Sequence, residues 1–232
     1  MELASFNTEW EICPYLHDRA SRQRVRLVDR VSDEDYSRLL AEGWRRFGRI
    51  VFRPACGSCQ ECVPIRVLVD RFRPTKSQRR VLRRNADVRV ELGDPKVDGA
   101  RLDLYHRFHA ERSRSRGWPI REIDLEEYAF TFVDNAARTI EFSYWIGERL
   151  IGVAYVGEAK DALNSIYAFT EPELSQRSLG TFDVLSEIDI ARERGLRYLY
   201  LGFWVKCCAS MEYKAAYRPH QLLRSDGWHF VP

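Results

Sequence analysis

The chain has 232 residues, of which 45% are hydrophobic and 31% are charged, and it carries a net charge of +3. This length can build one large domain or two smaller ones with a substantial buried core. No apolar run approaches the roughly 20 residues that span a bilayer, and the first residues lack the basic, apolar and small-residue order of a signal peptide. We therefore expect a cytoplasmic protein with no membrane partner.

The first third of the chain predicts one helix and two strands. Ser32 is a typical N-cap, and the acidic residues after it favour a helix within 32–44. Runs rich in β-branched residues at 49–53 and 65–69 are typical of strands. The segment 93–100, rich in Gly, Pro and Asp, predicts a linker. We therefore expect a first module over 1–93 and a second domain over 100–232.

Helices and strands follow one another beyond the linker. We expect helices over 101–116 and 123–136, two strands within 139–158 joined by a turn at Gly147 and Glu148, a strand over 162–170, a helix over 178–194 and a strand over 198–205. Successive antiparallel strands, then a helix and another strand, predict an α+β fold with a mixed sheet.

Basic charge is concentrated in one short segment. Residues 71–89 contain eight Lys or Arg and one Asp, so this segment carries +7 and the rest of the chain −4. Pro74 and then Thr75 or Ser77 can open a helix here. A solvated helix face is one interpretation, but the acidic partners that such a face usually has are missing. The segment therefore favours a nucleic acid, with contacts from Lys76, Arg79, Arg80, Arg83 and Arg84.

Three cysteines lie at three-residue intervals. Cys56, Cys59 and Cys62 form two overlapping C-x-x-C pairs, and Cys13 can add a fourth thiolate from a distant segment. Four thiolates suit a tetrahedral zinc ion or an iron–sulfur cluster. The alternative is that some of these cysteines are small buried hydrophobic residues at a turn.

The loop before the helix at 178–194 offers a second kind of site. It reads Gln176-Arg177-Ser178-Leu179-Gly180-Thr181. A helix N-terminus with an early Gly can present free backbone N–H groups to a phosphate. The loop resembles the turn with which acetyltransferase-like (GNAT) folds hold the pyrophosphate of coenzyme A. Ser178 as an ordinary N-cap is the alternative.

Five segments, in the same order, resemble one family. They are CPYL from Cys13, GWRRFG from Gly43, FRPACGSCQECVPIRV from Phe52, FRPTKSQRRVLRRN from Phe72 and YLGFWVKCCASMEYKAAYRP from Tyr200. Together they are similar to the aminoacyl-tRNA–protein transferases, and most of all to the bacterial enzymes that move leucine onto N-terminal Asp or Glu. The resemblance runs nearly from end to end of the chain. It implies a transfer that marks the acceptor protein for degradation by the N-degron route.

The resemblance also implies a fold and a set of partners. We expect an N-terminal Cys-rich α/β module followed by a GNAT-like mixed-sheet domain flanked by helices. The partners are aminoacyl-tRNA and acceptor proteins that begin with Asp or Glu, and no DNA. The tRNA ester is already activated, so the chemistry requires no cofactor. A zinc ion or iron–sulfur cluster at Cys13, Cys56, Cys59 and Cys62 would be structural or regulatory.

Candidate site residues follow from the matched motifs and from the chemistry. An acceptor carboxylate favours Arg or Lys as its partner. The catalytic candidates are Lys214, Tyr213 and Arg112, and the substrate-binding candidates are Arg66, Arg177, Ser178, Leu179, Gly180, Thr181, Trp204 and Arg218. A surface lysine and a core tyrosine are the alternative interpretations of Lys214 and Tyr213.

Two segments depart from the family pattern. Phe108 and Ser113 stand where Tyr and His are usual, and Thr170-Glu171-Pro172 replaces an aromatic residue followed by Asp-Pro. These departures leave rival functions open. They are an arginyl-tRNA–protein transferase, a coenzyme A-dependent N-acetyltransferase and a non-catalytic tRNA-binding protein.

Overall fold

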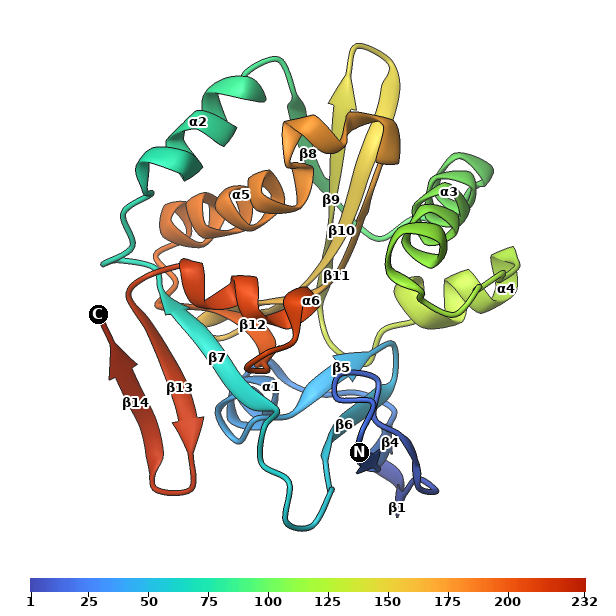
Figure 1. Cartoon of the computed structure of the whole chain (residues 1–232), viewed down its shortest axis with the longest axis vertical. Coiled ribbons are helices and arrows are strands. Elements are labelled where there is room, and N and C mark those ends of the chain that lie inside the picture. Colours follow the sequence, from blue (N-terminus) through green and yellow to red (C-terminus); the bar gives the residue numbers. More distant parts are fainter.

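The computed structural model describes all 232 residues and is built around one large sheet (Figure 1). The strand order in this sheet is β14-β13-β7-β12-β11-β10-β9-β8. Its strands are β7 (Val63–Leu68), β8 (Arg89–Gly93), β9 (Thr139–Ile146), β10 (Arg149–Ala159), β11 (Ala162–Thr170), β12 (Tyr198–Trp204), β13 (His220–Arg224) and β14 (Gly227–Val231). All neighbours pair antiparallel except β11 and β12, which are parallel. The sheet is therefore mixed.

A smaller antiparallel sheet is formed by the N-terminal residues. Its order is β1-β4-β6-β5, with β1 (Glu2–Asn7), β4 (Gln23–Val28), β5 (Arg45–Phe47) and β6 (Ile50–Pro54), and the short strands β2 (Glu11–Ile12) and β3 (Ala20–Ser21) pair separately. Helix α1 (Asp33–Ala41) joins the small sheet to the large one. The hydroxyl of Tyr36 would lie 2.4 Å from a Cβ at position 157, so only Gly157 allows α1 to pack this closely on β10.

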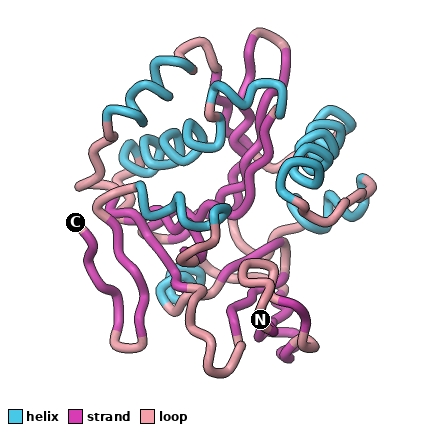
Figure 2. The backbone as a smooth tube through the Cα atoms, viewed as in Figure 1, coloured by secondary structure: helices cyan, strands magenta, loops and turns pink.

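Helices cover both faces of the large sheet (Figures 1 and 2). On one face α5 (Leu179–Glu193) packs its apolar side into the core, with α2 (Lys76–Arg84) beside it. On the other face lie α3 (Gly99–Arg116), α4 (Leu125–Tyr128) and a π-helical turn (Ala129–Val133). Three short segments, 3-10 turns at Pro172–Arg177 and Tyr213–Ala216 and helix α6 (Ala209–Glu212), complete the helical structure. No helix combines the length and the apolar composition needed to cross a membrane.

Capping residues place several elements where the sequence predicts them. The Ser32 side chain accepts from the Asp35 N–H at 3.1 Å and begins α1. Thr75 begins α2 with a capping box, because the Gln78 side chain in turn accepts from the Thr75 N–H at 2.8 Å. Gly117, in the left-handed conformation, ends α3 as predicted.

Two predicted helices need correction. The helix expected over 123–136 is a single α-helical turn, Leu125–Tyr128, that widens into the π-helical turn Ala129–Val133. Ser178 does not cap α5, because it lies in the left-handed region at φ 56° and its side chain makes no capping hydrogen bond. A 3-10 turn leads directly into Ser178, and the chain reverses there instead of entering the helix in the extended conformation of an ordinary N-cap.

The large sheet takes strands from both sides of the predicted linker at 93–100. Strand β7 pairs with β12 and β13, and β8 pairs with β9. The first 93 residues therefore form the small sheet and also complete the large one. The fold is α+β, with a small N-terminal sheet and a large mixed sheet flanked by helices.

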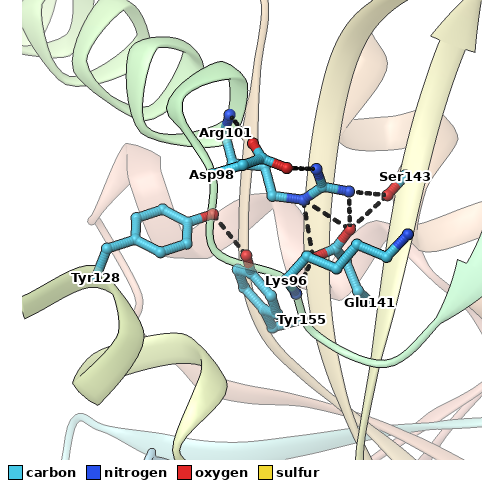
Figure 3. Close-up of polar contacts among 7 residues, drawn as sticks. All are labelled: Lys96, Asp98, Arg101, Tyr128, Glu141, Ser143 and Tyr155. Carbon is cyan, nitrogen blue, oxygen red and sulfur yellow. Dashed lines mark hydrogen bonds and ion pairs between the residues drawn. The ribbon is translucent and has the colours of Figure 1, made fainter. Parts of the chain in front are cut away.

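A buried ion pair fixes α3 to the large sheet (Figure 3). The Arg101 guanidinium donates to Glu141 on β9 at 2.6 and 3.0 Å, and both side chains are almost fully buried. Glu141 also accepts from the Ser143 hydroxyl and from the Lys96 N–H, and Asp98 caps α3 and contacts Arg101. A buried carboxylate that accepts from this many donors fixes the orientation of the helix on the sheet.

Replacing Glu141 with Gln is expected to lower the free energy of unfolding by roughly 3–5 kcal/mol, because it leaves the buried Arg101 charge without its partner. Urea unfolding measures this loss. The control is Glu34→Gln, which removes an exposed ion pair with Lys160 and should leave the midpoint nearly unchanged. Equal midpoints for the two variants would show that the buried pair does not anchor α3.

Candidate active site

Strands β11 and β12 pair over only part of their length. Their parallel register covers Ala162–Asn164 and Tyr198–Tyr200, whereas β11 continues to Thr170 and β12 to Trp204. Beyond this point each strand pairs only with its other neighbour, β10 or β7. The two strands therefore part in the middle of the sheet, and backbone groups at the point of divergence need other partners.

Arg45 from β5 supplies these partners. Its guanidinium donates to the Asn164 side chain at 2.7 Å, to the Ser165 carbonyl at 2.9 Å and to the Ile166 carbonyl at 3.1 Å. A Cβ at position 202 would lie 2.6 Å from the guanidinium carbon, and Gly202 has φ 81°, so a glycine is required here. Burial lowers the pKa of Arg45, and nearby tyrosines and Glu187 act against this shift.

Two buried carboxyl groups on α5 lie near the same point. Asp183 is 2% exposed and accepts from the Tyr144 hydroxyl at 2.6 Å. Glu187 is fully buried, and neither of its oxygens has a hydrogen-bond partner. Burial raises the pKa of Asp183 to about 7. Burial and then the Asp183 charge raise the pKa of Glu187 well above its ordinary value, while the nearby Ser165 hydroxyl and Arg45 lower it.

Tyr213 and Lys214 approach from the short segment after β12. The Lys214 ammonium is buried and donates to the Phe203 carbonyl at 2.9 Å. Burial and then the Arg45 charge lower the pKa of Lys214 to about 7. Tyr213 is half exposed, yet desolvation and then the charges of Asp183 and Glu187 raise the pKa of its hydroxyl to about 12. Tyr213 thus reaches from the surface to the buried carboxyl groups.

We call this arrangement the fork site. It consists of the point where β11 and β12 part and of the side chains Arg45, Ser165, Asp183, Glu187, Tyr213 and Lys214. Two of these groups, Asp183 and Lys214, have pKa values near 7. Groups that titrate near neutrality are suited to proton transfer at physiological pH. The structure thus brings Tyr213 and Lys214 together as catalytic candidates.

The N-terminus of α5 borders the fork site. Gly180 is exposed, and a Cβ there would meet no atom within 4 Å. Thr181 lies near Tyr217, which follows the Tyr213–Ala216 turn. Arg177 is directed to α2 instead, where it pairs with Asp87 at 2.7 Å. Of the predicted binding loop, Leu179–Thr181 therefore lies at the helix end and Arg177 links this end to α2.

Helix α2 lies next to this helix end (Figure 1). The Asn85 side chain donates to the Arg177 carbonyl at 2.9 Å, and Arg84 donates to the Gln176 carbonyl. Val81 and Leu82 pack against the core. Five basic side chains of α2 are exposed, and none has an ion-pair partner within 4.0 Å. They are Lys76, Arg79, Arg80, Arg83 and Arg84. We call them the α2 basic surface.

Three other residues predicted to bind substrate lie outside the fork site, and two of them already have partners within the fold. Arg66 is enclosed between Tyr198 and Trp228, at 3.8 and 4.1 Å from the ring centres, on the sheet face that packs α1. Exposed Arg218 donates to the backbone carbonyls of Ala215 and Pro232, and Trp204 is half-buried at the end of β12. Arg66 and Arg218 therefore have other partners within the fold.

Arg112 differs from these arginines. It is half-buried near the end of α3, and its guanidinium lies 4.9 Å from the ring centre of Phe108. Burial and then the Arg116 charge lower the pKa of Arg112, and Glu111, Tyr167 and Tyr213 lie near enough to act against this shift. No carboxylate or carbonyl oxygen of the protein accepts a hydrogen bond from its guanidinium, so its donors are available near Tyr213.

The four predicted metal-ligating cysteines are reduced and gather around Cys62. Burial raises the pKa of the Cys62 thiol to about 12, and Cys13, Cys56 and Cys59 add to this shift. No group of three or more His, Cys, Asp or Glu side chains in the structure is arranged to hold a metal ion. The thiols thus lie near Cys62 without forming a ligand set in this arrangement.

Sequence reasoning missed Arg45, Ser165, Asp183 and Glu187. One signal was available for the acids: Leu179, Asp183, Glu187 and Ala191 follow at intervals of four along α5. The outer two of these residues are apolar, so the two acids interrupt a buried stripe. Arg45 and Ser165 carry no comparable signal, because their role depends on where two distant strands part.

Comparisons with known proteins agree over most of the chain. Residues 11–80 and 100–224 match the N-terminal and C-terminal models of arginine-tRNA-protein transferase. An aspartate/glutamate leucyltransferase of Campylobacter jejuni is 36% identical over 220 residues, 94% of this chain and 92% of that protein. Another, of Marinobacter nauticus, is 38% identical over 229 residues, 97% and 95% of the two chains. Among solved structures, FemX is similar with a TM-score of 0.48 at 10% identity, over 81% of this chain and 64% of that one.

These matches define an enzyme of the aminoacyltransferase class that uses charged tRNA. The chain belongs to the arginine-tRNA-protein transferase family.

Proposed function

We propose that this enzyme transfers leucine from leucyl-tRNA to the N-terminal Asp or Glu of acceptor proteins and so marks them for degradation. The choice of leucine and of acidic acceptors rests on relatives named aspartate/glutamate leucyltransferases, which are 31–38% identical over nearly the whole chain. One structural observation carries the proposal: three features follow one another along one side of the large sheet. They are the α2 basic surface, the N-terminus of α5 and the fork site.

This continuity suits a charged tRNA. Phosphates of the acceptor stem would lie on the α2 basic surface, since unpaired Lys and Arg provide most of the affinity for nucleic-acid backbones. The terminal nucleotide would reach the N-terminus of α5, where exposed Gly180 allows close approach. Because the N-terminus of α5 borders the fork site, the leucyl ester would lie where β11 and β12 part.

The reaction demands little beyond positioning and charge. The attacking group is an α-amine, whose ordinary pKa of roughly 7.7–8.0 leaves a usable neutral fraction near pH 7. Lys214, buried beside the Phe203 carbonyl, would stabilise the negative charge that develops on the ester carbonyl oxygen. Tyr213, half exposed above the carboxyl groups, is placed between the entering amine and the buried site.

Arg112 is the best-placed group for the acceptor side chain. Its guanidinium has no carboxylate partner and lies near Tyr213. Guanidinium binds a carboxylate with two parallel hydrogen bonds, which both orients the acceptor and selects it. An N-terminal Asp or Glu bound in this way would place its α-amine toward the fork site.

A second candidate function is transfer of arginine, because the matching family model is described as arginine-tRNA-protein transferase. The test is incubation of the purified protein with leucyl-tRNA or arginyl-tRNA, radiolabelled on the amino acid, and peptides beginning with Asp, Glu, Arg or Ala. The proposal expects label to pass from leucyl-tRNA to the Asp and Glu peptides alone. Transfer from arginyl-tRNA would favour the arginine-transferring function over the leucine-transferring one. Acetylation of the peptides by labelled acetyl-coenzyme A would contradict both functions.

Metal binding by Cys13, Cys56, Cys59 and Cys62 is a separate proposal, supported by the convergence of their thiols. It concerns stability or redox regulation, not the transfer step. Metal analysis of protein purified without oxygen tests it, and the absence of both zinc and iron would end it.

A further inference from the structure

Two acids occupy positions on α5 that an ordinary core would give to apolar side chains. Asp183 and Glu187 are one helical turn apart and share a stripe with buried Leu179 and Ala191. Both acids are at most 2% exposed. Burying a carboxyl group costs free energy unless the group is paired or hydrogen-bonded, so the fold alone does not explain this pair.

Glu187 has unmet bonding capacity. Both of its oxygens are buried. The Ser165 hydroxyl lies near enough to lower the pKa of Glu187, but no donor reaches either oxygen in good hydrogen-bond geometry, whereas Asp183 accepts from the Tyr144 hydroxyl. A buried carboxylate without partners is costly, and a neighbouring carboxyl group raises the cost further. A cation entering the fork site would remove this cost, because it would pair with the unpartnered oxygens.

The groups around the pair come from four other elements. Tyr144 faces it from β9, Ser165 from β11, Arg45 from β5, and Tyr213 and Tyr217 from the segment after α6. Only Arg45 among them is cationic, and its donors are engaged by Asn164 and by the carbonyls of residues 165 and 166. The pair thus has no internal cation within 4.0 Å, and half-exposed Tyr213 connects it to the surface.

We propose that Glu187, paired with Asp183, binds the N-terminal ammonium of the acceptor and takes from it the proton that must leave before attack. This role rests on the proposed transfer of an aminoacyl group. An ammonium is attracted by these acids and repelled by Lys214 and Arg45. The amine would therefore bind at the acids, and the ester oxygen would lie at Lys214.

The step balances with the groups present. Glu187 takes one proton from the ammonium, and the nitrogen lone pair attacks the ester carbonyl to form a C–N bond. The C–O bond to the tRNA ribose then breaks with its electron pair. The ribose oxygen takes the second proton from the nitrogen, and Glu187 returns its own proton to water.

The test is the single-turnover rate of transfer from leucyl-tRNA to an Asp peptide at saturation, measured from pH 6 to pH 9. Glu187→Gln is expected to lower the rate at pH 7 about 100-fold. The deficit should shrink as the pH rises past roughly 8, where the amine is neutral without help. Affinity for leucyl-tRNA and the melting temperature should stay at the wild-type level. The matched control is Glu193→Gln, an exposed acid on the same helix.

A second variant keeps the proposal testable if Glu187→Gln does not fold. The Asp183 charge raises the pKa of Glu187, so Asp183→Asn should lower that pKa and move the acid limb of the rate profile to lower pH. An unshifted limb in Asp183→Asn, or a loss in Glu187→Gln that is equal at every pH, would overturn the role. An inactive wild-type protein would instead overturn the proposed transfer itself.

Discussion

Replacement of Arg79, Arg80 and Arg83 by Glu is expected to weaken binding of leucyl-tRNA by roughly a thousandfold at about 0.1 M salt, the largest effect we predict for any variant. The three side chains are exposed on one face of α2 and have no acidic partner. Their positive charge is therefore available to phosphates, and its reversal replaces attraction with repulsion. The slope of log affinity against log salt should also fall by about three.

The control for this variant keeps the same net charge. Arg24 on β4, Arg30 just beyond β4 and Arg224 at the end of β13 are also exposed, and β4 and the β13–β14 turn lie away from α2 (Figure 1). Replacing these three with Glu should change affinity only slightly. Filter binding across a salt series measures both proteins. If the two triple variants lost affinity equally, tRNA binding would depend on the overall positive charge of the protein and not on the α2 basic surface in particular.

Replacement of Arg112 by Met is expected to lower kcat/KM for peptides beginning with Asp or Glu by roughly 100-fold, or about 3 kcal/mol, and to leave a peptide beginning with Ala unaffected. The guanidinium makes no hydrogen bond or ion pair within the protein and contacts only the Phe108 ring, so the fold depends little on its charge. Its loss would remove the contact with the acceptor side chain and preserve the site for leucyl-tRNA.

Arg114→Met provides the comparison for Arg112. Arg114 lies on the same helix, is exposed and pairs with Glu111 at 3.0 Å, so its replacement should not alter acceptor choice. Steady-state kinetics with Asp, Asn and Ala peptides measure the discrimination directly. An Arg112→Met enzyme that still preferred Asp over Asn by the wild-type factor would show that another group recognises the carboxylate.

Local signals predicted the elements whose ends are fixed by local chemistry. Ser32, Thr75 and Gly117 bond to backbone groups one turn away, and helices α1, α2 and α3 begin or end at these residues. Ser178 failed as a cap because the preceding 3-10 turn forces a left-handed residue there. The preference of serine for an N-cap position is thus overridden when the preceding turn gives it a left-handed backbone conformation.

The candidate site was predicted only where a motif carried it. The segment with Tyr213 and Lys214 and the basic stripe of α2 are contiguous in sequence, and both lie where the proposal needs them. Arg45 and Arg66 are both strand arginines in motif-rich segments, yet only Arg45 reaches the fork site. The difference depends on sheet order and on the parting of β11 and β12, which are non-local properties.

The most direct test of the whole account is the mass of the acceptor peptide after reaction with leucyl-tRNA. Peptides beginning with Asp, Glu, Asn and Gln, alike in size but not in charge, are mixed with the enzyme in one reaction. The account predicts the mass of one leucyl residue added at the N-terminus of the Asp and Glu peptides and none on the Asn and Gln peptides. Equal modification of all four, or of none while tRNA still binds, would contradict it.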